Sequence, residues 1–163
     1  CRKGGRILVV EPGTSARSNL DRFMGFCEFF SERGIEHKLK LFTPPATNEE
    51  AAPELLASLS EQDDFRVLYG PANNELLEAL IESGQYENSV KSMAKIVHDL
   101  SPYSEEHLRS GLIDMVIDSN PMQQAFGAVD FIARQYGYVT QTNTANIDFQ
   151  FYTSENLPLA HSI

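Results

Sequence analysis

Five short apolar runs alternate with helix-like segments along the first two thirds of this chain, and this alternation most constrains the fold. The first run, RILVVE at 6–11, is nearly continuous, which is typical of a strand buried on both faces of a parallel sheet. The others lie at 37–42, 65–70, 93–98 and 113–117. Helical patterns separate them at 15–33, 47–60, 73–84 and 104–110. This order predicts an α/β fold: a doubly wound, mainly parallel sheet of five to six strands with helices on both faces.

The run at 111–133 connects a strand to a longer helix. The strand ends in Asp118-Ser119-Asn120, and Pro121 then opens a helix expected to reach 136. The polar segment 140–146 is interpreted as a connection, and alternation at 147–153 predicts a last, more exposed strand. Because the helix carries an apolar face, we expect it to pack against this domain or a neighbouring chain.

Composition excludes several classes of function. A length of 163 residues fits one domain, and a net charge of −10 argues against direct binding to a nucleic-acid backbone. The sequence shows neither a membrane-spanning run nor a signal peptide, so we expect no membrane partner. Cys27 is expected to be a small core residue, and the four histidines lack metal-ligand spacing, so we expect no metal and no cofactor. The start at Cys1, without an initiator Met, indicates a piece of a longer chain.

Polar side chains cluster where the predicted strands end, which is where parallel sheets bind ligands. With no good nucleophile–base pair among them, they suit a polyhydroxylated ligand, whose hydroxyls both donate and accept hydrogen bonds. Simpler roles stay open: helix capping for the two asparagines, a turn for Asp99 and a surface charge for Arg22. Dinucleotide-binding and phosphate-loop patterns are absent, and so are the residues of a phospho-receiver domain. The set comprises Ser18, Arg22, Asn73, Asn74, Asp99, Asp118, Ser119 and Asn120.

The chain resembles the C-terminal part of the type I periplasmic-binding-protein fold, shared by sugar-binding proteins and the effector domains of lactose-repressor-type regulators. The resemblance lies in GGRILVVEPG, SNLDRFMGF, VLYGPANNELLEALIESG, KIVHDLSPYSEEHLRSGLIDMVIDSNPMQQAFGAVDF and IDFQFYTSENL, in that order. It implies that Arg22, in the pattern that begins at Ser18, grips the ligand and that Asp99 binds its hydroxyls. Asn73 and Ser119 would complete the pocket. Ser119 stands where the family often has Gln, and this shorter side chain would enlarge the pocket.

The family has two lobes that clamp the ligand between them, and the resemblance assigns residues 1–163 to a single domain, the C-terminal lobe. Residues 118–146 would supply crossing segments and a helix of the missing lobe. The implied function is a sugar- or polyol-sensing domain of a cytoplasmic, homodimeric transcription regulator, not an enzyme, with DNA bound through a domain elsewhere. The alternatives are a periplasmic solute-binding protein of a sugar transporter and a flavodoxin-like enzyme. His98 and Asp99 are adjacent, but strand neighbours point to opposite faces, which disfavours the enzyme.

Overall fold

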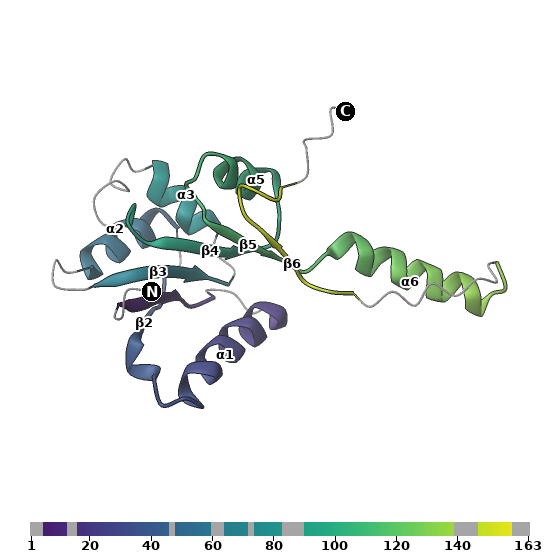
Figure 1. Ribbon diagram of the computed structural model, residues 1–163, viewed down its shortest axis with the longest axis horizontal. Coiled ribbons are helices and arrows are strands. Elements are labelled where there is room, and N and C mark those ends of the chain that lie inside the picture. The colour runs from purple at the N-terminus through teal and green to yellow at the C-terminus, as the bar shows by residue number, and fades with distance from the viewer. Residues whose placement is uncertain are drawn as a thin grey trace.

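A six-stranded sheet organises the protein (Figure 1). The computed structural model describes residues 5–12, 16–45, 48–59, 64–71, 74–82, 90–138 and 147–157. The strand order is β2-β1-β3-β4-β5-β6, and all neighbours are parallel except β6, which runs antiparallel to β5. The strands are β1 (Arg6–Val10), β2 (Leu39–Phe42), β3 (Phe65–Gly70), β4 (Ala94–His98), β5 (Met115–Asp118) and β6 (Gln150–Tyr152). The predicted α/β class and sheet are confirmed.

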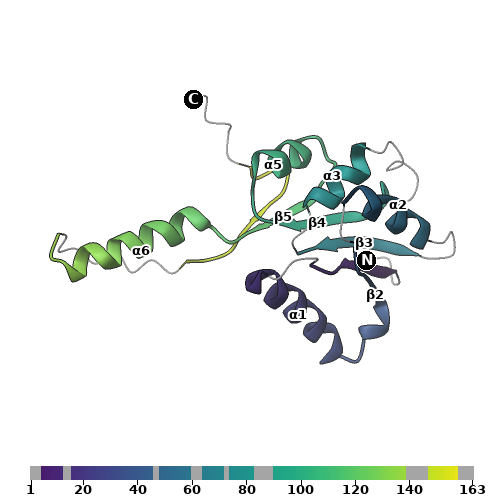
Figure 2. The ribbon, with the colours of Figure 1, turned by 180° about the vertical axis from the view of Figure 1, so that it is seen from behind.

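Helices lie on both faces of this sheet, as the alternation predicted. In Figures 1 and 2, α2, α3 and α5 cover one face while α1 lies on the other. A single turn of 3-10 helix, η1 (Glu36–Lys38), precedes β2. The helices are α1 (Arg17–Ser31), α2 (Asn48–Ser58), α3 (Asn74–Glu82), α5 (Pro102–Arg109) and α6 (Pro121–Gln135).

The hydrophobic core lies between the sheet and the layer formed by α2, α3 and α5. Leu8 from β1, Leu55 from α2 and Leu80 from α3 are fully buried there. Leu108 from α5 and Val116 from β5 extend the same cluster to the far strands. Burial of such large aliphatic side chains contributes about 1.5–3 kcal/mol each. This layer therefore holds the strand ends of β4 and β5 in place.

Helix α1 packs much more loosely than the helices on the opposite face, and it has no buried residue. Its main apolar contact is Phe26, which stacks on Tyr69 of β3 with ring centroids 4.0 Å apart and planes at 12°. Cys27 is only partly buried, so the prediction that it is a core residue is wrong. Helix α1 does have an apolar face, but the sheet covers only part of it.

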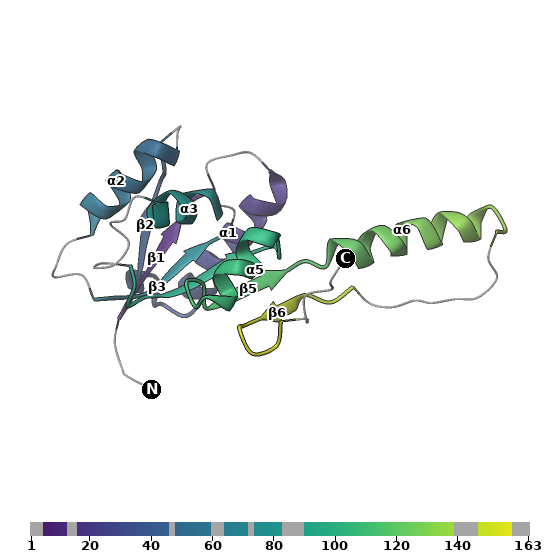
Figure 3. The same cartoon turned by 90° about the horizontal axis from the view of Figure 1, so that it is seen from above.

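Helix α6 projects from the end of the sheet, away from the rest of the described chain (Figure 3). Most of its side chains are exposed, among them Phe126 at 66% and Phe131 at 63%. A returning segment runs beside it, since a Cβ added at Gly127 would lie 3.8 Å from Ile147 Cδ1. The expectation that this helix packs against the present domain is wrong, and packing against a neighbouring chain stays a prediction.

The bounds of several helices and strands differ from the predictions by a few residues. Helix α2 begins at Asn48 and runs through Pro53, with Ala51, Ala52 and Leu55 buried around it. The fourth helix begins at Pro102 instead of at 104, because Ser101 caps it and pairs reciprocally with Ser104. The strand predicted from 37 begins at Leu39, after η1.

No helix among the described residues is both long and apolar enough to span a membrane. The predicted connection 140–146 lies outside the described residues.

Candidate functional site

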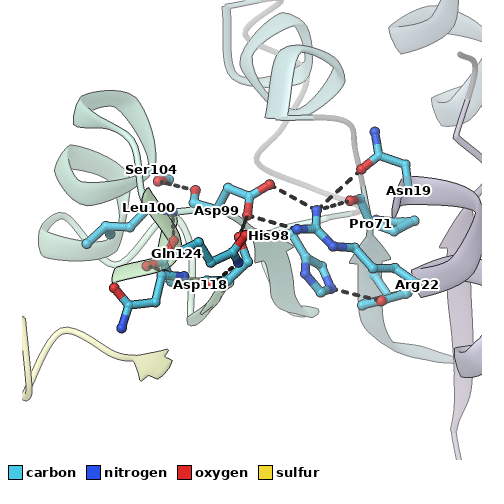
Figure 4. A network of polar contacts seen from close by, with 12 residues as sticks. Asn19, Arg22, Pro71, His98, Asp99, Leu100, Ser104, Asp118 and Gln124 are labelled. Atoms are coloured by element: carbon cyan, nitrogen blue, oxygen red, sulfur yellow. Dashed lines mark hydrogen bonds and ion pairs between the residues drawn. The ribbon is translucent and has the colours of Figure 1, made fainter. Parts of the chain in front are cut away.

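A bidentate ion pair joins α1 to the end of β4. Arg22 Nη1 donates to Asp99 Oδ2 at 2.9 Å, and Nη2 donates to Oδ1 at 3.0 Å (Figure 4). The same Nη1 also lies near the Pro71 carbonyl oxygen, at 3.4 Å, and Asn19 Oδ1, at 3.3 Å. The Arg22 side chain is 16% exposed, whereas that of Asp99 is 51% exposed. The pair thus anchors a guanidinium on one side and offers a carboxylate to solvent on the other.

Asp99 has a backbone conformation that non-glycine residues rarely adopt. Its φ is +63°, in the left-handed region. Two hydrogen bonds stabilise this turn: Asp99 N donates to the Ile117 carbonyl at 2.9 Å, and the Ser104 hydroxyl donates to the Asp99 carbonyl at 3.2 Å. The turn directs the carboxylate away from the strand and toward Arg22.

Ser119 adds a third contact from the end of β5. Its hydroxyl donates to Asp99 Oδ1 at 3.0 Å. Burial raises the pKa of Asp99, but the hydrogen bond and charge of Arg22, with the Ser119 hydrogen bond, outweigh it and hold this pKa below its ordinary value. The carboxylate is therefore ionised at neutral pH and available as a hydrogen-bond acceptor.

These residues line an open cleft of about 690 Å³. Four of the five predicted site residues meet there: Ser18, Arg22, Asp99 and Ser119. Residues that the prediction missed complete the lining: Asp21, Pro121, Gln124 and Phe149.

Two of the missed residues could have been found from helical spacing. Asp21 lies three residues after Ser18, on the same face of α1, and Gln124 lies three residues after Pro121 on α6. No helical spacing points to Phe149. It directly precedes β6 and reaches the cleft because the chain returns to the sheet there.

Other predicted strand-end residues take different places. Asn73 lies outside the described residues. Glu11, the residue that follows β1, accepts a hydrogen bond from the Thr43 hydroxyl, and neither residue lines the cleft. Asp118 and Asn120 are buried behind the cleft, at 7% and 9% exposure.

A buried polar pair lies beside the cleft. Tyr69 Oη and His98 Nε2 are 2.9 Å apart. Burial and the nearby Arg22 charge lower the pKa of His98 to about 4, against a smaller opposing effect of Asp99. Burial raises the pKa of Tyr69 to about 12, with a smaller contribution in the same direction from Cys27 and an opposing effect of the Arg22 charge. Both groups are neutral at pH 7, so the phenol can donate to Nε2. As expected, His98 and Asp99 bind different partners.

The described part of the chain holds no cluster of three or more His, Cys, Asp or Glu side chains suited to a metal ion. What the cleft offers is two carboxylates, a guanidinium, two hydroxyls, an amide and one aromatic ring. Such a lining can orient a small polar molecule by hydrogen bonds and contact its apolar face through Phe149.

Comparison with known proteins relates the fold to a group of binding proteins. No protein-family model and no curated protein matches the chain. The solved structures that it resembles include GanP, a glucose-galactose binding protein from Geobacillus stearothermophilus, with a TM-score of 0.61 and 19% identity over 96% of this chain. Another is AraP, an arabinose binding protein from the same organism, with a TM-score of 0.66 and 14% identity over 93% of this chain. A XylFII–LytSN complex matches 95% of this chain with a TM-score of 0.64 and 15% identity.

This chain spans 55% of the GanP and AraP chains and 62% of the XylFII–LytSN chain. At such low identities the likeness shows the fold alone. The protein therefore has a type I periplasmic-binding-protein-like fold.

Proposed function

We propose that this chain is a sugar-binding domain whose ligand lies in the cleft at Arg22 and Asp99. The observation that carries the proposal is the ion pair itself: an anchored guanidinium presents a half-exposed carboxylate to an open cleft. Since Asp99 Oδ2 accepts only the Arg22 hydrogen bond among the described residues, it has a lone pair for a ligand hydroxyl.

A sugar matches the remaining groups of the cleft. The ring hydroxyls both donate and accept, so one can donate to Asp99 while another accepts from Ser119 or Gln124. The exposed ring of Phe149 suits the apolar C–H face of a pyranose. The resemblance to glucose-galactose and arabinose binding proteins supports the same class of ligand.

For the whole protein, we propose a cytoplasmic, lactose-repressor-type transcription regulator that acts as a homodimer. Sugar binding would shift the dimer between two states of different DNA affinity, with DNA bound through another domain. The sequence motifs shared with regulator effector domains support this role. The absence of a good nucleophile–base pair in the sequence supports a binding function over an enzyme.

A second candidate is the solute-binding component of a sugar transporter, which the two binding proteins from Geobacillus favour. The complete gene product distinguishes the two roles. A regulator shifts operator DNA in a gel, and the sugar changes the affinity of that complex. A transporter component binds the sugar without DNA binding and is recovered outside the cytoplasm.

A thermal-shift screen with D-glucose, D-galactose, L-arabinose and D-xylose tests sugar binding. At a hundred times the dissociation constant, a ligand stabilises the folded state by about 2.7 kcal/mol, which raises the melting temperature by roughly 5–10 °C for a chain of this size. We expect at least one sugar to give this shift in the wild type but not in Arg22→Met. Equal shifts in the two proteins would place the ligand elsewhere, and no shift with any of the four would contradict the proposed ligand class.

A further inference from the structure

The buried carboxylate of Asp118 joins the ends of two neighbouring strands. Asp118 is the last residue of β5 and is 7% exposed. Its Oδ1 accepts a hydrogen bond from Leu100 N, and its Oδ2 accepts one from Asn120 N, both at 3.1 Å. Figure 4 shows Asp118 behind the Arg22–Asp99 pair, beside Leu100. The carboxylate therefore contacts the two loops that follow β4 and β5.

Each of these amides adjoins a residue of the cleft. Leu100 follows Asp99, and Asn120 follows Ser119, so a single side chain restrains both turns. Both turns contain a residue in the left-handed region: Asp99 has a φ of +63° and Asn120 a φ of +56°. Such conformations are unfavourable for residues other than glycine and persist only where the surroundings hold them.

We propose that Asp118 is a positioning residue for the ligand site: its carboxylate holds the two left-handed turns so that Asp99 and Ser119 meet in the cleft. Asp118 itself does not line the cleft, so it acts through these two residues. Its relevance to binding rests on the proposed function, but the positioning can be measured without any ligand.

The pKa of the Asp99 carboxyl group measures the positioning. Loss of the Asp118 negative charge and loss of the Asp99 contacts with Arg22 and Ser119 would shift this pKa in opposite directions. If Asp118→Asn only removed a neighbouring negative charge, ionisation of Asp99 would become easier and its pKa would fall. If Asp118 positions Asp99, the variant weakens the contacts of Asp99 with Arg22 and Ser119, and the pKa rises because burial remains.

The experiment is a ¹³C NMR pH titration of the Asp99 carboxyl carbon in the wild type, Asp118→Asn and Asp114→Asn. Asp114 is a matched control, since its carboxylate also accepts a backbone hydrogen bond between β4 and β5, from Lys95 N at 2.8 Å, at the opposite end of the strands. We expect a raised Asp99 pKa in Asp118→Asn alone. An unchanged or lowered pKa, or an equal rise in Asp114→Asn, would overturn the proposal.

A measurement on the wild type decides the question if Asp118→Asn does not fold. Amide hydrogen exchange of Leu100 and Asn120 should be slow, because both N–H groups donate to a buried carboxylate. Exchange of both amides at the rate of exposed loop amides would overturn the proposal. Neither measurement involves a sugar, so failure of sugar binding and failure of positioning are separate results.

Discussion

Ser119 donates its hydroxyl hydrogen to Asp99 across the ends of two adjacent strands, with Oγ 3.0 Å from Oδ1. The contact joins two residues that are 20 positions apart in the sequence. It also completes a hydrogen-bonded chain from α1 through Arg22 and Asp99 to the start of α6. The cleft is thus built from groups that hold one another in position before any ligand binds.

Ser119→Ala should raise the pKa of Asp99. The hydroxyl hydrogen bond is one of the contacts that stabilise the ionised carboxylate, so its loss makes protonation easier. A carboxyl ¹³C titration measures the change. Ser110→Ala is the control, because Ser110 is exposed and donates only to the His107 carbonyl in the described chain. A lowered Asp99 pKa in Ser119→Ala would contradict the described geometry.

Arg22→Met should have two effects. The burial that raises the pKa of Asp99 would remain after the stabilising cation is lost, so this pKa should rise above its ordinary value of 3.8. The free energy of unfolding should fall by roughly 1–3 kcal/mol, because the hydrogen bonds to Asp99 and Pro71 are lost. Urea unfolding measures the second effect. Arg17→Met, which removes an exposed pair with Asp21, should change stability by less than about 1 kcal/mol.

Stability should fall on mild acidification because of His98. A His whose pKa is lowered in the folded state takes up its proton mainly in the unfolded state, so stability is lost as the pH falls from about 6.5 toward 4. This linkage amounts to about 2 kcal/mol between pH 7 and pH 5. His98→Gln cannot titrate and should lose correspondingly less stability in urea unfolding over that range. An equal loss in both proteins would show that His98 is not the group responsible.

Phe26→Ala should loosen α1 and, with it, the Arg22–Asp99 ion pair. Phe26 provides the ring stack on Tyr69, and its removal should cost about 2 kcal/mol of unfolding free energy. Because α1 carries Arg22, amide exchange along the helix should also speed up. Phe29→Ala is the matched control, since Phe29 is 49% exposed on the same helix. Similar changes in both variants would mean that the stack does not dock the helix.

Strand positions were predictable because buried parallel strands need short, nearly unbroken apolar runs. The run RILVVE contains β1, which ends one residue earlier at Val10, and Phe65–Gly70 was predicted with its correct bounds. That Asp99 and Ser119 lie at the ends of strands was predictable, because the strand ends follow from the alternation itself. Their contacts with each other and with Arg22 depend on the tertiary structure and cannot be predicted from a local sequence pattern.

The errors have physical causes that lie outside local patterns. Cys27 lies on an apolar helical stripe, but periodicity does not reveal how much of a stripe the sheet covers. The start of α5 was missed although Ser101-Pro102 with Ser104 is a capping signal. Phe149 reaches the cleft only because the chain returns to pair β6 with β5.

Calorimetric titration of a sugar into the wild type, Asp99→Asn and Asp114→Asn measures directly whether the Asp99 carboxylate contributes to sugar binding. Asp99→Asn retains the size of the side chain but removes the charge that a sugar hydroxyl would contact, while Asp114 lies at the other end of the sheet. Hydrogen bonds to charged groups are worth about 1.5–3 kcal/mol, so we predict that Asp99→Asn weakens binding by roughly 10- to 100-fold. Asp114→Asn should bind like the wild type. Equal affinity in wild type and Asp99→Asn would contradict the account.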